Sequence, residues 1–207
     1  MFNQGGVPSD QLDFLKELEN IGAGHAATAL ASMLGHEVNI SVPRAQFCPY
    51  EQISDILDGP ETVVAGLLVG ISDDLDGYIL LVLKRDDAFE LTKSIISQMG
   101  GEVDEDGEFN ELQVSALKEL SNILIGSYLS AISSLTGLRI DASVPELVLD
   151  MAGAVLNLLV SAYGEYGDNV LFMETEFVES EHSIFGHFFL IPDVDSYNRL
   201  MAQMGLA

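Results

Sequence analysis

The chain carries one pattern twice, displaced by 102 positions, and this repeat constrains the fold more than any other feature. Residues 13–43 can be laid on residues 115–145 without a gap, and LKEL at 15–18 returns unchanged at 117–120. A repeat dictates architecture, because each copy forms the same supersecondary unit. The repeated positions include polar residues and a proline: Asp13, Glu17, Asn20 and Pro43 return as Ser115, Glu119, Asn122 and Pro145. A repeat kept only for packing would keep apolar residues, so we interpret it as a duplicated functional surface.

Length and composition favour one compact body. The chain has 207 residues, of which 48% are apolar, so it can bury a substantial core. We predict a single domain over residues 1–207, composed of pseudo-repeats 9–100 and 108–207. The segment Gly100–Gly107, rich in Gly, Asp and Glu, is expected to link the two halves.

Periodicity predicts the same series of elements in both halves. Apolar residues at helical spacing predict long helices over 10–34 and 110–135, with Gly35 and Gly137 as stops. Alternating patterns follow, each with a proline near its middle, which predicts edge or bulged strands. The expected strands are 37–47 and 138–149, then hairpins 63–71 with 78–83 and 169–178 with 184–191, before closing helices 86–99 and 193–204. The sequence therefore predicts an α/β (α+β) fold.

One segment differs between the halves. The displacement grows from 102 positions at Pro145 to 109 at Gly186, which corresponds to Gly77. The added residues fall in 150–166, an apolar stretch long enough for a helix, whose counterpart at 51–57 predicts only a short turn. The extra helix either adds to the core or provides a docking surface on one side of a pseudo-symmetric body.

The charge balance excludes several partners. Eight basic residues against 33 acidic ones give a formal net charge of -25, which repels nucleic acid and anionic membranes. The acidic excess fits either a salt-rich cytoplasm or a basic partner surface. Cys48 is the single cysteine, the longest apolar run is 63–71, and the first ten residues lack a basic stretch. We expect a cytoplasmic protein that binds no membrane.

Several chemistries lack their motifs. The sequence has no GxxxxGK[ST] loop and no GxSxG elbow, and its four histidines show no HExxH spacing. We therefore expect no metal or cofactor of its own, and any phosphoryl group must arrive with its own cation. Gly22 and Gly24 lie inside a predicted helix, and we attribute them to close helix packing rather than to a dinucleotide loop.

The repeated polar residues share one face of each long helix. Asp13, Glu17 and Asn20 lie at i, i+4 and i+7, a spacing that places them along a narrow stripe. An amide can orient a water molecule but is too weakly basic to deprotonate it. Orientation is sufficient for phosphoryl transfer, which depends mainly on alignment and charge stabilisation. We therefore expect the asparagine to align water and the glutamate to bind a positive group on a partner, with the proline shaping the nearby backbone.

The motif Asp/Ser-x3-Glu-x2-Asn-x22-Pro, present twice, resembles the signature of the CheC family of chemotaxis phosphatases, which also includes CheX and FliY. The resemblance covers essentially the whole chain and implies that Glu17, Asn20, Glu119 and Asn122 are catalytic. In that family these residues hydrolyse the aspartyl phosphate of a phosphorylated CheY response regulator. The resemblance implies that Asn orients the water and that Glu contacts a receiver lysine. It also implies that Mg²⁺ belongs to the regulator, which agrees with the few basic residues of this chain.

Two motifs in one chain of this size point to the CheC branch and to a monomer. The resemblance implies a pseudo-two-fold body, with both long helices on one side of a mostly antiparallel sheet. It also implies CheD, a receptor deamidase, as a second partner, with residues 150–166 as a candidate contact. Two functions remain open, a phosphatase and a non-catalytic adaptor that binds CheD or a flagellar switch component. Ser115 replaces Asp13, so we expect the second site to be the more active.

Overall fold

The fold is described from a computed structural model, which defines residues 9–35, 37–102, 108–163, 169–179 and 182–205. The expected series of elements is present in both halves. In chain order the elements are α1 (Ser9–Leu34), β1 (Asn39–Pro49), the 3₁₀ turn η1 (Tyr50–Gln52), α2 (Ile53–Ile56), β2 (Val63–Asp73), β3 (Gly77–Lys84), α3 (Arg85–Gln98), α4 (Glu111–Thr136), β4 (Ile140–Ala142), β5 (Glu146–Met151), α5 (Ala152–Tyr163), β6 (Asn169–Glu179), β7 (His182–Pro192) and α6 (Val194–Gln203).

Among the described residues, seven strands form one sheet in the order β1-β6-β7-β3-β2-β4, with β5 also paired to β2. All of these pairings are antiparallel, and the fold class predicted from the sequence is confirmed. The two halves alternate in the sheet, because β1 pairs with the hairpin of the second half and β5 with the hairpin of the first. At the centre, Leu80 of β3 pairs with Phe189 of β7, which lies 109 positions further on. The pattern of strand pairing therefore has two-fold symmetry about the Leu80–Phe189 pair. The division into pseudo-repeats 9–100 and 108–207 stays a prediction.

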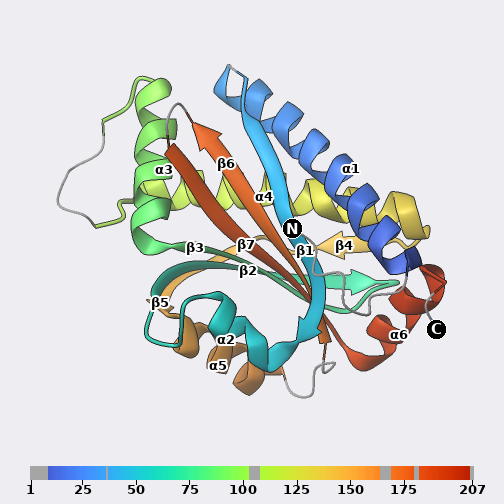
Figure 1. Ribbon diagram of the computed structural model, residues 1–207. Coiled ribbons are helices and arrows are strands. Elements are labelled where there is room, and N and C mark those ends of the chain that lie inside the picture. The colour runs from blue at the N-terminus through green and yellow to red at the C-terminus, as the bar shows by residue number, and fades with distance from the viewer. Residues whose placement is uncertain (1–8, 36, 103–107, 164–168, 180–181, 206–207) are drawn as a thin grey trace.

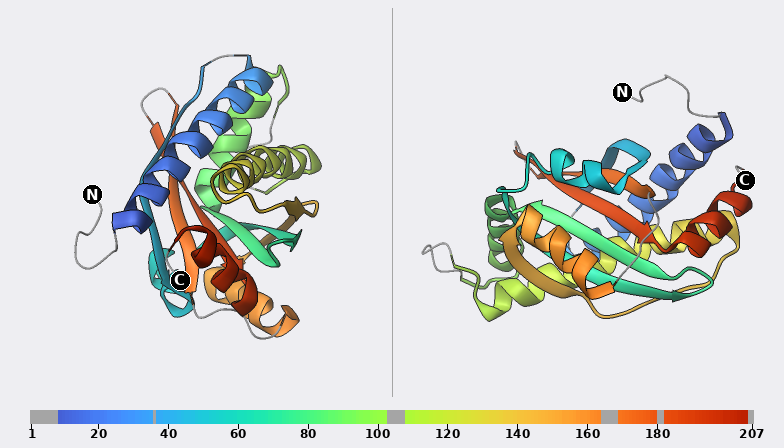
Figure 2. Two further views of the ribbon diagram at one scale, coloured as in Figure 1. Left: turned by 90° about the vertical axis from the view of Figure 1, so that its right-hand side faces the viewer. Right: turned by 90° about the horizontal axis from the view of Figure 1, so that it is seen from below.

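Helices cover both faces of the sheet (Figure 1). The larger apolar cluster joins α1, α3, α4 and α6 to one face, as was expected for the two long helices. The smaller cluster packs α2 and α5 on the other face. Figure 2 shows α1 and α4 crossing each other at an angle. The two helices that carry the repeated polar residues therefore lie together in one layer.

The ends of the long helices follow from local sequence. Gly35 and Gly137 have φ angles of 76° and 74°, a left-handed conformation that favours glycine, so both predicted stops are confirmed. At the start of α4, the Asn110 side chain accepts from the Gln113 backbone N–H at 2.9 Å, and the Gln113 side chain accepts from the Asn110 backbone N–H at 3.2 Å. This reciprocal pair satisfies two backbone donors at the helix start. The predicted linker 100–107 lies largely outside the described residues.

The segment added to the second half is the helix α5, and its counterpart is the short pair η1 and α2. One stripe of α5 is buried, including Val155, Leu156 and Leu159, so this stripe contributes to the core. Leu158 is 47% exposed on the remaining surface. The described helices include none that is long and apolar enough to cross a membrane.

Candidate functional site

Glu17 and Asn20 are exposed on α1. The helix is oriented by Leu15 and Leu18, which are 2% and 0% exposed and belong to the apolar cluster beneath it. Because residues three and four apart share a helix face, burial of these leucines turns the polar stripe toward solvent. Asp13 is also exposed, and one of its carboxylate oxygens lies 3.9 Å from the Lys16 ammonium. Both side chains are well exposed, so this ion pair contributes little.

Glu119 and Asn122 have the equivalent exposed positions on α4. Leu117 and Leu120 are 0% and 1% exposed and hold this helix in the same way. Ser115 is exposed as well, and its hydroxyl donates to the Glu111 backbone oxygen at 2.8 Å. Each helix therefore presents a Glu–Asn pair to solvent, and α1 also presents Asp13. Their catalytic role remains a prediction, but both amides are open to a docked molecule.

Both repeated prolines lie where one strand holds an extra residue. The β1–β6 register runs from Ser41↔Glu176 to Arg44↔Glu174, so Pro43 lies within a bulge on the edge strand β1. This confirms the prediction of a bulged edge strand.

In the second half, the predicted strand over 138–149 is divided into β4 and β5, with the buried Pro145 between them. Proline has no N–H to donate to the sheet, and the Ser143 hydroxyl accepts from the Gly70 backbone N–H at 3.0 Å at this break. Pro43 and Pro145 shape equivalent irregularities, while their expected position beside the asparagines stays a prediction.

The crossing of α1 and α4 is built around Gly22. A Cβ at this position would collide with the ring of Tyr128, which is 0% exposed. The Tyr128 hydroxyl is 2.9 Å from the hydroxyl of Thr175 on β6, and burial raises the pKa of Tyr128 to about 12. Close helix packing therefore explains Gly22, as predicted. The same prediction was wrong for Gly24, which is exposed, because a Cβ added there would have no described atom within 4 Å apart from its chain neighbours and the local helix backbone.

A second polar cluster lies across the strands on the opposite face and was missed by the sequence analysis. Arg44, Glu174 and His187 come from β1, β6 and β7 and line a cavity of about 440 Å³ together with Lys84 and Asp58. Their charges are largely paired inside the cluster, with Lys84 Nζ 2.7 Å from Asp58 Oδ2 and His187 Nε2 3.6 Å from Glu174 Oε2. These residues are far apart in the sequence and come together only in the tertiary structure, so no local sequence pattern predicts the cluster.

Ionisation within this cluster follows from burial and pairing. The hydrogen bond and the positive charge of Lys84 lower the pKa of Asp58, and Asp58 in turn raises the pKa of Lys84. Burial lowers the pKa of His187 and outweighs the opposing effect of the Glu174 carboxylate. Within the described residues, no group of three or more His, Cys, Asp or Glu side chains could hold a metal ion.

Comparison with known proteins supports a specific relationship. The model of the CheC-like family matches residues 11–45 and 112–149, which contain the two copies of the motif. CheY-P phosphatase CheC of Bacillus subtilis (strain 168) is 33% identical over 202 residues, covering 97% of this chain and 96% of that protein. Flagellar motor switch phosphatase FliY of the same organism is 32% identical over 137 residues, covering 66% of this chain but 35% of that protein.

The crystal structure of Thermotoga maritima FliY has the same fold, with a TM-score of 0.74, 22% identity and 98% of both chains covered. The near-complete alignment with the Bacillus CheC and the match of both motif segments agree with the architecture described above. The chain belongs to the CheC-like family.

Proposed function

We propose that the protein is a phosphatase that hydrolyses the aspartyl phosphate of a phosphorylated CheY-type response regulator. The observation that carries this proposal is the pair of exposed Glu–Asn stripes on α1 and α4, in a chain aligned along 97% of its length with a CheY-P phosphatase. Such a reaction ends or adapts the chemotaxis signal sent to the flagellar motor.

The asparagines Asn20 and Asn122 align the attacking water, each through an amide that both donates and accepts. The water oxygen forms a bond to phosphorus while the bond from phosphorus to the aspartyl carboxylate breaks. The products are the unmodified aspartate side chain of the regulator and inorganic phosphate, which takes up the proton released by water. The loose transition state requires alignment and charge stabilisation rather than a strong base. Mg²⁺ bound by the regulator would neutralise charge on the phosphoryl oxygens.

The glutamates Glu17 and Glu119 hold the regulator in position. A carboxylate repels a phosphate placed against it but attracts an ammonium group on the regulator. Since Glu precedes Asn by three residues, the two side chains project from adjacent turns of one face. The glutamate therefore anchors the regulator while the asparagine meets the phosphoryl group.

The two sites differ in local charge. Asp13 adds a negative charge one turn before Glu17, and the exposed Lys16 compensates for it only weakly at 3.9 Å. Ser115 occupies the equivalent place beside Glu119 and carries no charge. A phosphorylated regulator bearing negative charge should approach the second site more readily, so we propose that Glu119 and Asn122 contribute the larger share of turnover.

A second candidate function is a non-catalytic adaptor that binds the receptor deamidase CheD or a flagellar switch component. The observation that favours it is α5, which is present in only one half and leaves Leu158 47% exposed. We propose α5 as the CheD contact, on a cytoplasmic monomer. In this arrangement the Glu–Asn stripes and the CheD surface lie on different elements, so their effects can be separated.

The deciding experiment measures phosphate release from a phosphorylated CheY receiver, with and without this protein, and then with Asn20→Ala/Asn122→Ala. We expect the double variant to return hydrolysis to the spontaneous rate while CheD binding is unchanged. The matched control is Ser32→Ala/Ser134→Ala, exposed positions 12 residues further along the same helices and also 102 positions apart. Undiminished hydrolysis by the asparagine variant would show that these residues are not catalytic, whereas a wild-type protein that does not accelerate phosphate release would favour the adaptor.

A further inference from the structure

Two exposed glycines occur at equivalent positions beside the asparagines. Gly24 follows Asn20 by four residues in α1, and Gly126 follows Asn122 by four residues in α4. Both glycines are exposed, and both lie well inside helices of 26 residues. The pattern therefore places a residue without a side chain next to each candidate catalytic amide.

Neither backbone conformation nor internal packing requires glycine at these positions. Gly24 and Gly126 are absent from the residues with positive φ, so their backbone is one that any residue can adopt. Apart from the chain neighbours and the local backbone of the same helix, no heavy atom in the described part of the chain lies within 4 Å of a Cβ built on either glycine. Gly22 provides the contrast, because a Cβ there would collide with the Tyr128 ring.

Glycine is unfavourable inside a helix. It loses more conformational freedom on folding than alanine, which lowers the folding equilibrium constant roughly fivefold at each such position. Gly22 is replaced by Leu124 in the second half, but Gly24 is repeated as Gly126. The glycine that is repeated is thus the one without an internal packing role.

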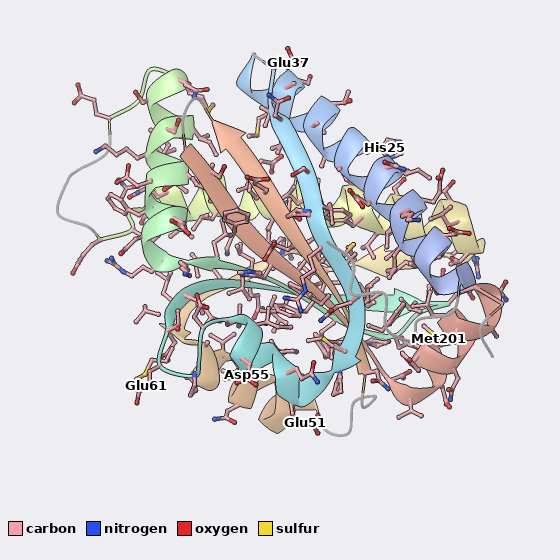
Figure 3. All side chains as sticks on the ribbon, viewed as in Figure 1. His25, Glu37, Glu51, Asp55, Glu61 and Met201 are labelled. Carbon is pink, nitrogen blue, oxygen red and sulfur yellow. The ribbon has the colours of Figure 1, made fainter. Side chains whose placement is uncertain are left out.

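The two glycines extend the polar stripe toward the helix C-terminus. A separation of four residues is about 6 Å along the axis, and residues at i and i+4 share one face. His25, the residue after Gly24, is visible on the outer side of α1 in Figure 3. A molecule that reached Asn20 would therefore also cover the bare backbone at Gly24.

We propose that Gly24 and Gly126 are positioning residues, which leave the helix backbone uncovered so that the surface around the regulator's phosphorylated aspartate can pack directly against it. This inference rests on the proposed phosphatase function. The asparagine side chain is short, and its amide must come within about 3 Å of the attacking water. A side chain one turn away could prevent the regulator from packing on the helix. The amide would then be too far from the attacking water.

A single methyl group is sufficient to test this idea. The Cβ of alanine projects ~1.5 Å from Cα, and its own radius adds to the displacement of a surface packed on the helix. A misplacement of about 1 Å in a reacting geometry can reduce the rate about 100-fold. Replacement of both glycines should therefore impair the reaction even though the added methyl groups meet no packed side chain among the described residues.

The experiment compares the full-length wild type with Gly24→Ala/Gly126→Ala and with the matched control Ser32→Ala/Ser134→Ala. The first measurement is kcat/KM for phosphate release from a CheY receiver phosphorylated by acetyl phosphate. The second is the Kd for the same receiver loaded with beryllium fluoride, a stable mimic of the aspartyl phosphate. The third is the melting temperature.

We expect the glycine variant to lose about 100-fold in kcat/KM and to bind the beryllium fluoride receiver at least tenfold more weakly. Its melting temperature should rise by about 2–4 °C for each glycine replaced, because alanine favours the helix. The serine control should keep wild-type kcat/KM and Kd. Loss of activity together with gain of stability separates a positioning role from a structural one.

Three results would overturn the inference. Wild-type kcat/KM and Kd in the glycine variant would refute it while leaving the proposed function intact. A fall in melting temperature would show that the glycines serve the fold instead. A wild-type protein that does not accelerate phosphate release would refute the proposed function, and the inference with it.

Discussion

The substitution Gly22→Ala tests how tightly α1 and α4 are packed. The added Cβ would lie 2.7 Å from Tyr128 Cε1 and closer still to Cδ1, which is far inside van der Waals contact. The ring cannot move away easily, because its hydroxyl lies 2.9 Å from the Thr175 hydroxyl and its centroid lies 5.0 Å from the Phe188 ring centroid. Tyr128 is 0% exposed, so relief of the clash must displace one of the packed helices.

The expected cost combines opposing contributions. Overpacking a core costs about 1–3 kcal/mol, and weakening the Tyr128–Thr175 hydrogen bond adds about 1 kcal/mol. Replacing glycine by alanine inside a helix stabilises the folded state by about 1 kcal/mol. We therefore expect a net destabilisation of about 2 kcal/mol and a melting temperature about 4–8 °C lower.

Urea unfolding of the wild type and Gly22→Ala, repeated in a Tyr128→Leu background, measures this directly. Leucine removes the ring, so the cost of the added methyl should fall by at least about 1 kcal/mol in that background. Gly24→Ala, two residues along the same helix, is the control and should stabilise the protein. If Gly22→Ala were stabilising, or cost the same in both backgrounds, the packing argument would be wrong.

Three further changes have defined outcomes. Asn110→Ala removes the cap of α4 and should reduce the free energy of unfolding by about 1 kcal/mol, measured by urea unfolding. In assays of regulator dephosphorylation, Asn122→Ala should lose more turnover than Asn20→Ala, because less negative charge lies beside the second site, and the opposite ranking would refute this. Burial lowers the pKa of His187 despite the nearby Glu174, so the histidine takes up a proton less readily in the folded state than in the unfolded state. The free energy of unfolding should therefore fall as the pH drops below about 6.5. Between about pH 8 and pH 5, the His187→Gln variant should lose less of this free energy than the wild type.

The helices and their polar stripes were predictable because their signals are local. The stops at Gly35 and Gly137 and the stripe of Glu17 and Asn20 depend on residues within one or two turns. The prolines indicated irregular strands for the same reason, since a missing N–H acts at its own position. What these local signals did not reveal was that β4 and β5 would separate at Pro145.

The roles of the glycines could not be separated in the sequence. Gly22 and Gly24 lie two residues apart in similar surroundings, yet one is packed on Tyr128 and the other is open. A helix face is buried or exposed only relative to its neighbours, and the neighbour of α1 lies about 100 residues away along the chain. Sequence reasoning therefore assigned both glycines to packing.

The repeat by itself determined the kind of elements, their order and the duplication of a Glu–Asn stripe, because periodicity and spacing are properties of neighbouring residues. Tertiary structure alone decided that strands of the two halves alternate in one sheet and that Arg44, Glu174 and His187 meet across three of those strands. It also decided which repeated residues remain open to a partner. Those outcomes depend on contacts between segments far apart in the chain, which no local pattern encodes.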